Sequence, residues 1–290
     1  MVLRIQRSKA SLKRTAKVLI STLYFIGRGL FDSLRRAIGM RRNQRLVVLC
    51  YHAVPASARD QFSSQMDMVA RHARVVQATA TPTDDQGDAV AITFDDAFRS
   101  VAENAVGALE KRNFPATIFV PAGVLGRAPD WKFESGYDSD KGEEIMTLEE
   151  LQRLDPSRIT LGCHSMTHPR LTDLDESGLK TELIDSRVRL ETELGRKIAT
   201  LAFPYGAHDE KVVEACRRAG YETVFSITPR PTKTTPEFVR GRVTVEPNDS
   251  PLEFFLKMQG AYSWMAGASE LKASIKRALG RAPSKDERAS

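Results

Sequence analysis

An apolar run that ends on two adjacent carboxylates is the feature that most constrains this chain. Residues 89–96 read A-V-A-I-T-F-D-D. An unbroken apolar run of this kind is typical of a strand buried on both faces, as in a parallel sheet. Asp95 and Asp96 then stand at the carboxyl end of a strand, where α/β folds place their chemistry. The alternative is an ordinary strand-to-helix turn in which Asp96 caps the next helix.

A second stretch places histidines in a similar position. Residues 159–168 read I-T-L-G-C-H-S-M-T-H, which predicts an apolar strand that ends on His164, with His168 four residues later. A catalytic zinc needs three protein ligands and one open position. Two histidines and one carboxylate meet that count, and the second carboxylate is left to act as a base. Pro169 disfavours a helix at His168, so we expect a loop there.

Strand-like and helix-like segments alternate from residue 46 to residue 262. We expect strands at 46–51 and 74–77, from 89, at 115–121, from 159, and at 198–203, 222–227 and 242–245. We expect helices at 62–73, 98–112, 148–154, 176–194, 208–219 and 251–262. Residues 122–144 are expected to form a long surface loop. Repeated strand–helix units predict a parallel sheet or a (β/α) barrel. The sequence contains no dinucleotide-binding, P-loop, H-E-x-x-H or G-x-S-x-G motif.

Charge divides the chain into a basic arm and an acidic remainder. Residues 1–45 hold twelve Lys and Arg and one acid, Asp32, which gives +11, whereas the remainder carries −5. The three cysteines, Cys50, Cys163 and Cys216, are an odd number without a close pair. They therefore provide neither a disulfide framework nor a cysteine-based zinc site.

The basic arm also carries apolar residues. Residues 18–26 form an apolar run of nine, shorter than the roughly 20 residues needed to span a bilayer, and no signal-peptide cleavage site follows it. Residues 30–40 place apolar and basic side chains on opposite helix faces. This combination predicts an anchor on an anionic membrane surface. An uncleaved signal anchor and a disordered extension are alternatives, whereas a nucleic-acid arm would not need so many bulky apolar residues.

Three motifs occur in order, each after an expected strand: T-F-D-D at 93–96, H-S-M-T-H-P at 164–169 and F-P-Y-G at 203–206. Together they resemble the NodB-homology polysaccharide deacetylases, carbohydrate esterase family 4. The resemblance covers residues 46–262, including Y-H-A-V from residue 51 and R-G-R-V-T-V from residue 240. It implies a distorted (β/α) barrel at 46–262. The arm at 1–45 would be a basic amphipathic helical extension, and 263–290 a basic C-terminal helix or tail.

The resemblance also implies roles for individual residues. Asp95 resembles the catalytic base of the family, and Asp96, His164 and His168 resemble the ligands of a divalent metal. That metal is commonly zinc, with Co²⁺ or Mn²⁺ as alternatives. The backbone N–H of Tyr205 resembles the donor that stabilises the oxyanion.

The chain departs from the family pattern at three places. Ala202 stands where many members have an arginine that pairs with the base, so another group must orient Asp95. Ala97 stands where glycine is usual, and no histidine follows His208, so the late L-x-H motif that supplies the catalytic acid is missing. We expect His208 to be a surface residue. His52, which closes an expected strand at the same edge of the sheet, is a candidate for a role in the site.

These features predict a metal-dependent hydrolase that removes N-acetyl groups from an amino sugar in a polysaccharide, oligosaccharide or lipid-linked glycan. One alternative is a weakly catalytic family member that binds glycan at a membrane. Another is a metal-dependent amidase or esterase with a non-sugar substrate. The expected partners are the glycan and an anionic membrane surface, and not nucleic acid. The expected location is a bacterial-type cell envelope, peripheral to or anchored at the cytoplasmic membrane.

Overall fold

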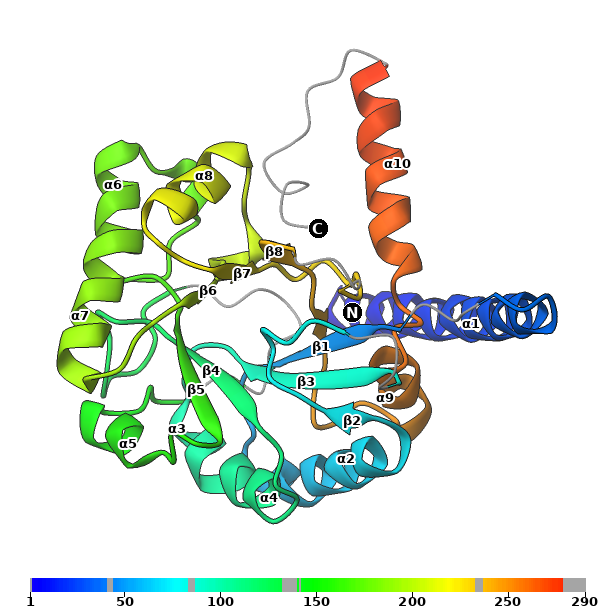
Figure 1. Cartoon of the computed structure of the whole chain (residues 1–290), viewed down its shortest axis with the longest axis horizontal. Coiled ribbons are helices and arrows are strands. Elements are labelled where there is room, and N and C mark those ends of the chain that lie inside the picture. Colours follow the sequence, from blue (N-terminus) through cyan, green and yellow to red (C-terminus); the bar gives the residue numbers. More distant parts are fainter. Residues whose placement is uncertain are drawn as a thin grey trace.

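A curled parallel sheet forms the body of the protein in the computed structural model, which describes residues 2–40, 44–82, 87–131, 140, 142–232 and 237–278 (Figure 1). Within these residues nine strands pair in parallel in the order β8-β7-β6-β5-β4-β3-β1-β9, with β2 also paired to β3. The strands are β1 (Leu46–Tyr51), β2 (Arg74–Val75), β3 (Ala89–Phe94), β4 (Ala116–Val120), β5 (Ile159–Cys163), β6 (Thr200–Ala202), β7 (Thr223–Phe225), β8 (Val239–Arg240) and β9 (Val243–Thr244).

The two ends of the sheet meet in one short segment. Strand β8 pairs with β7, and β9 pairs with β1, yet only Gly241 and Arg242 separate β8 from β9. This segment therefore bridges the two edges and completes the curled sheet as a distorted (β/α) barrel. The fold class predicted from the sequence is confirmed, and the arm is helical as expected.

The described helices mostly surround the curled sheet, and the first and last of them extend away from it (Figure 1). They are α1 (Val2–Ala37), α2 (Arg59–His72), α3 (Arg99–Val101), α4 (Gly107–Glu110), α5 (Leu148–Arg153), α6 (Glu176–Lys180), α7 (Ser186–Leu194), α8 (Glu210–Arg218), α9 (Pro251–Met258) and α10 (Trp264–Ala278). A π-helical turn at Ala102–Val106 joins α3 to α4, and another at Thr181–Asp185 joins α6 to α7. A capping box begins α5, with the Thr147 hydroxyl accepting the Glu150 N–H at 3.2 Å.

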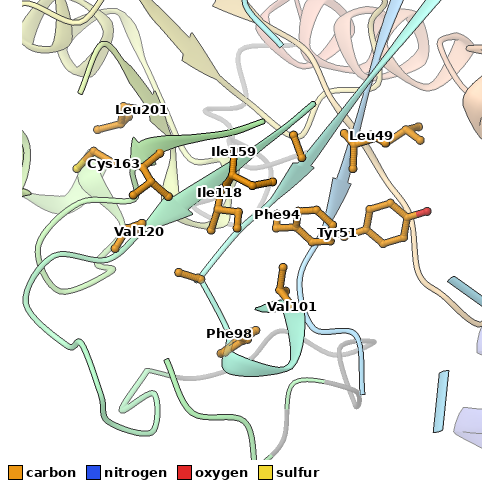
Figure 2. Close-up of a cluster of buried hydrophobic side chains, with 14 of the residues drawn as sticks. Leu49, Tyr51, Phe94, Phe98, Val101, Ile118, Val120, Ile159, Cys163 and Leu201 are labelled. Carbon is orange, nitrogen blue, oxygen red and sulfur yellow. The ribbon is translucent and has the colours of Figure 1, made fainter. Parts of the chain in front are cut away.

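Strand alternation sorts side chains between the helices and the barrel interior. Val90, Ile92 and Phe94 of β3 pack into the main hydrophobic core against the helices. Ala89 and Ala91, which alternate with them, belong to a separate, smaller cluster. Figure 2 shows part of the main core, where Phe94 lies beside side chains of the neighbouring strands. The same alternation directs Asp95, the next residue of odd number after the strand, toward the interior.

The interior is filled by two phenylalanines. The rings of Phe119 on β4 and Phe225 on β7 lie 5.4 Å apart. Gly162 on β5 makes room for them, because a Cβ there would approach the Phe119 ring to 2.6 Å. The interior of the barrel is thus a packed core. The polar groups described below lie at the end of this core formed by the carboxyl ends of the strands.

Some local expectations were wrong. The arm is one continuous helix, α1, which contains the apolar run at 18–26 and most of the segment at 30–40. Strand β8 was not expected, and α8 begins at Glu210, with the Asp209 carboxylate accepting the Val212 N–H as its cap, so His208 precedes the helix. Of the expected loop at 122–144, residues 132–139 and 141 lie outside the described residues. Among the described helices, none has an apolar stretch long enough to cross a membrane.

Candidate active site

The chain turns sharply after β3, and this turn separates two neighbouring carboxylates. Asp96 and Ala97 have φ values of 64° and 51°, in the left-handed region that residues with a Cβ rarely adopt. The side chain of Asp95 consequently points into the barrel, and that of Asp96 points toward the two histidines that follow β5. Both carboxylates are buried. The sequence placed them together at a strand end, and the turn gives them different surroundings.

Asp95 is held by an arginine that the sequence analysis did not assign. Arg242 donates from Nη1 to Asp95 Oδ1 at 2.6 Å and from Nη2 to Oδ2 at 2.8 Å, which makes a fully buried bidentate ion pair. The thiol of Cys50 donates to Oδ2 at 3.3 Å. Arg242 also donates to the Thr93 hydroxyl and the Ser226 carbonyl, both at 3.3 Å. The carboxylate therefore has a fixed direction and a paired charge.

This pairing decides the charge of Asp95. Burial alone would raise the pKa of the carboxyl, but Arg242, helped by the nearby His164, holds the pKa of Asp95 well below its usual range. Asp95 is consequently ionised across the physiological pH range. Burial raises the pKa of the Cys50 thiol well above its usual value, so the thiol stays protonated and remains a donor.

Arg242 reaches Asp95 through the segment that joins β8 to β9. Gly241 is required there, because a Cβ would approach the Thr228 carbonyl oxygen to 2.3 Å. The guanidinium lies over the ring of Phe119, with its Cζ 5.2 Å from the centroid. Arg242, in the segment between β8 and β9, therefore supplies the cation that is missing at Ala202, where many family members have an arginine. The R-G-R-V-T-V stretch was the available signal, once an arginine was known to be missing at 202.

The two histidines come from β5 and the loop after it. Ser165 and His168 both have positive φ, at 66° and 61°. The buried carboxylate of Glu182 holds this loop, because it accepts the backbone N–H groups of Met166 at 2.8 Å and Thr167 at 2.9 Å. The Ser165 hydroxyl accepts the His168 N–H at 3.0 Å. The loop predicted from Pro169 is thus present, and Glu182 is a further residue that sequence reasoning missed.

Asp96, His164 and His168 form a compact set of potential metal ligands. The Nε2 atoms of both histidines lie 3.5 Å from Asp96 Oδ1, and the three candidate ligand atoms lie within 4.8 Å of one another. The Nδ1–H of His164 donates to the Ala202 carbonyl at 2.9 Å, so its Nε2 carries the lone pair. The structure therefore brings together the three residues that the sequence singled out as ligands.

The donor set fits a divalent cation. Asp96 Oδ1 is buried and has no hydrogen-bond partner among the described residues. Burial, and then the negative charge of Asp95, raise the pKa of Asp96 well above its usual value. Burial lowers the pKa of His164 to about 4 and that of His168 well below its usual value, so both rings are neutral. A positive ion would stabilise this arrangement, because neutral imidazoles and a carboxylate are the ligands that zinc accepts.

Cys50, His52 and Asp95 form a second set of potential ligand atoms within 4.8 Å of one another. This set is less suited to a metal, because Arg242 already neutralises Asp95 through both oxygens. The buried thiol would also have to lose its proton. The first set is therefore the better candidate for a metal centre, and the second surrounds the candidate base.

Aromatic side chains surround His168. The Trp131 ring stacks on it at 4.3 Å between centroids, with an interplanar angle of 22°. The Tyr205 ring contacts it edge-on at 4.6 Å, and Tyr205 itself has a φ of 58° in the turn after β6. The ring of His208 stacks instead on Phe203 at 4.8 Å, and its Nδ1 lies 2.8 Å from the Gly206 carbonyl. His208 is half-buried, so the expectation of a surface residue was only partly met.

His52 directly follows the last residue of β1. The next residues are held in place, because the Val54 N–H donates to the Ser100 hydroxyl at 3.1 Å and Asn104 Nδ2 donates to the Val54 carbonyl at 2.8 Å. Asn104 belongs to the π-helical turn after α3, a feature that is frequent at functional sites. Candidate ligand atoms of His52, Asp95 and Cys50 lie within 4.8 Å of one another, so His52 is close to the candidate base.

The comparisons with known proteins agree with this arrangement. A profile of the polysaccharide deacetylase family matches residues 83–224, which include both carboxylates, both histidines and Tyr205. Over these residues the chain is similar to the polysaccharide deacetylase family. Members of this family are carbohydrate de-N-acetylases, hydrolases of carbon–nitrogen bonds other than peptide bonds, and they are generally metal-dependent. The enzyme class expected from the sequence is confirmed.

Solved structures similar to this chain share its fold. IcaB from Ammonifex degensii is 26% identical, with a TM-score of 0.61, over 76% of this chain and 98% of that one. The Streptococcus pyogenes deacetylase PplD is 19% identical, with a TM-score of 0.61, over 75% and 99%. BC0361, a polysaccharide deacetylase from Bacillus cereus, is 20% identical, with a TM-score of 0.60, over 74% and 69%. No curated protein matches the sequence significantly.

Proposed function

We propose that this protein uses a divalent metal at Asp96, His164 and His168 to remove N-acetyl groups from an amino sugar in a polysaccharide, oligosaccharide or lipid-linked glycan. The observation that carries this proposal is the contrast within one buried carboxylate pair. Asp95 is ionised by a bidentate arginine, and Asp96 has a buried oxygen atom without a partner beside two neutral imidazoles. Such a pair provides a base beside a ligand set.

When bound, the metal supplies a Lewis acid that polarises the amide carbonyl and lowers the pKa of water. Zinc is the expected ion, with Co²⁺ or Mn²⁺ as alternatives. Asp96, His164 and His168 hold the ion. Asp95 accepts a proton from the attacking water, and Arg242 keeps its carboxylate charged and correctly directed. The water oxygen forms a bond to the acetyl carbon, and the carbonyl oxygen becomes an oxyanion.

The backbone N–H of Tyr205 donates to that oxyanion in this proposal. His52 takes the role of the missing late histidine and donates a proton to the sugar nitrogen as the C–N bond breaks, which releases acetate and a free amine. Its support is its position beside Asp95, with its candidate ligand atom within 4.8 Å of those of Asp95 and Cys50. The rigid attachment of the adjacent backbone to Ser100 and Asn104 fixes the direction from which it approaches.

We also propose that the enzyme works at the cell envelope, with α1 as the element that attaches it to an anionic membrane surface. The support is the composition of α1, which combines nine Lys and Arg with bulky apolar residues. Nucleic acid is not an expected partner.

Acetate release from N-acetylglucosamine oligomers by the metal-free protein, before and after addition of Zn²⁺ or Co²⁺, tests the proposed function. We expect release that depends on added metal and on Asp95. Binding of the oligomers without release by the metal-loaded protein would favour a weakly catalytic glycan binder. Release from non-sugar acetamides or acetyl esters, with none from the oligomers, would instead identify an amidase or esterase of another substrate class.

A further inference from the structure

Helix α1 is attached to the catalytic body along one face. Phe25 packs edge-on against Phe255 of α9, with 5.6 Å between ring centroids, and Val18 packs against the main core. The buried hydroxyl of Ser21 accepts a hydrogen bond from Trp264 Nε1 at 2.9 Å. Val18, Ser21 and Phe25 are spaced three and four residues apart, so they lie on one side of the helix.

Ion pairs and hydrogen bonds extend this attachment along the helix. Arg14 donates to Glu253 Oε2 at 2.6 Å and to Asp249 Oδ1 at 2.9 Å. Two turns beyond the Ser21 contact, Arg28 donates to the Gln259 carbonyl at 2.7 Å. Farther on, Asp32 accepts from Arg45 at 3.0 Å. The contacts span residues 14–32, roughly 27 Å of helix at 1.5 Å per residue. Helix α1 is therefore fixed to the body at several points and is not a flexible tether.

The opposite face of α1 is apolar and exposed. We call it the outer face, and its members are Leu12, Leu19, Leu23, Ile26, Leu30 and Leu34. Each is between 52% and 72% exposed. At 100° per residue these six fall within one narrow stripe, centred about half a turn from the side that holds Ser21 and Phe25. Figure 1 shows α1 extending beyond the edge of the sheet.

The exposed charges of α1 indicate what covers the outer face. Lys13, Lys17 and Arg36 are exposed, and their long stems can carry the charged ends toward lipid headgroups. The single acid of the helix, Asp32, is already paired with Arg45. A second copy of α1 packed on this stripe would bring basic flanks together without acidic partners. An anionic lipid surface matches both the apolar stripe and the charge.

We infer that the outer face of α1 lies in the headgroup region of an anionic membrane, while the opposite face holds the catalytic body, so that α1 is a rigid mount. This inference deepens the proposed attachment of α1 to a membrane, and its consequence for substrate rests on the proposed deacetylase activity. A rigid mount holds the active site at a constant orientation to the membrane. It should therefore favour N-acetylated glycan that is attached to the same surface over glycan that is free in solution.

The first experiment measures binding of the full chain to vesicles of phosphatidylglycerol and phosphatidylcholine. Leu23→Glu and Leu30→Glu should each weaken binding about tenfold or more, because a charge replaces an apolar side chain that enters the membrane surface. The matched control is Val188→Glu, an exposed apolar residue on α7, which should leave binding unchanged. Unchanged binding by both outer-face variants would overturn the inference. So would a chain that is dimeric without lipid and monomeric as Leu23→Glu, since a second copy would then cover the stripe.

The second experiment compares vesicle-borne and soluble N-acetylated glycan. Arg14→Ala and Phe25→Ala should still bind vesicles but lose the rate advantage on vesicle-borne substrate, and their rates on soluble oligomers should match the parent. Equal rates on both substrates for the parent, or an advantage kept by both variants, would show that α1 is only a tether. Vesicle binding without turnover of either substrate would refute the proposed deacetylase activity but not the inference that the outer face of α1 binds a membrane.

Discussion

The two halves of the active site, one around Asp95 and one around Asp96, differ in how completely the protein supplies their hydrogen bonds. Around Asp95, both carboxylate oxygens accept hydrogen bonds from Arg242, and one also accepts the Cys50 thiol. Around Asp96, a buried oxygen and His168 Nδ1 have no partner among the described residues. Burying a charge is costly unless it is paired. One carboxylate is therefore completed by the folded chain, and the other keeps a buried oxygen that could bind a cation.

The largest expected effect separates the two halves directly. Asp95→Asn should keep the metal and lose about 10²- to 10⁴-fold in kcat, because the amide cannot accept the proton of the water. Asp96→Asn, His164→Ala and His168→Ala should lose metal affinity, and excess metal should restore part of their activity. Metal content by elemental analysis and acetate release are measured on all four variants. If Asp95→Asn is isolated without metal, or Asp96→Asn keeps its metal and loses only rate, the two roles are reversed.

The next effect concerns the cation that completes the first half. Arg242→Ala leaves Asp95 buried without its counter-charge, and breaking a buried pair in this way costs about 3–5 kcal/mol of unfolding free energy. Arg242→Lys keeps the charge but not the bidentate geometry, so it should lie between Arg242→Ala and the parent. Urea unfolding gives the free energies and acetate release gives the rates. A parent-like unfolding midpoint for Arg242→Ala would show that the ion pair does not stabilise the barrel.

The difference between the halves also explains what the sequence could predict. Asp95, Asp96, His164 and His168 follow buried strands in short motifs, so local pattern and chain order were sufficient to group them. Arg242 lies 147 residues from Asp95, and only the closure of the sheet by β8 and β9 brings it there. No local pattern encodes such a contact. The barrel could likewise be predicted from alternating segments, whereas the way the sheet closes could not.

Helix α1 shows the same limit of local reasoning. Its basic and apolar composition was evident from the sequence, which predicted an amphipathic arm. Its attachment depends on Phe255, Glu253 and Trp264, which lie more than 220 residues farther along the chain. Trp131 and Glu182, which contact the histidine loop, were missed for a related reason, because neither residue stands in a motif with the residues it touches.

A smaller effect is expected at the position where the family arginine is missing. Ala202 is fully buried on β6, and Arg242 already occupies the space beside Asp95. Ala202→Arg should therefore not raise kcat, and crowding should cost about 1–3 kcal/mol of unfolding free energy. The double variant Ala202→Arg with Arg242→Ala tests whether an arginine at 202 can replace Arg242. If the single variant is faster than the parent, the two arginines are not alternatives, and the base half is less complete than its hydrogen bonds indicate.

The smallest effect tests the turn at which the two halves separate. Ala97 has a φ of 51°, a conformation that costs a residue with a Cβ roughly 1–2 kcal/mol. Ala97→Gly relieves this cost but loses about 0.5–1 kcal/mol through the greater freedom of glycine in the unfolded chain. The unfolding free energy should therefore change by less than about 1 kcal/mol, and kcat and metal content should stay as in the parent.

Ala91→Gly is the matched control, because Ala91 is equally buried within β3 but lies in extended backbone, where glycine only weakens the strand. Urea unfolding of the two variants should place Ala97→Gly above Ala91→Gly by about 1 kcal/mol. If both glycines destabilise the protein equally, the left-handed backbone at Ala97 carries no strain, and the divergence of Asp95 and Asp96 is held by their partners alone.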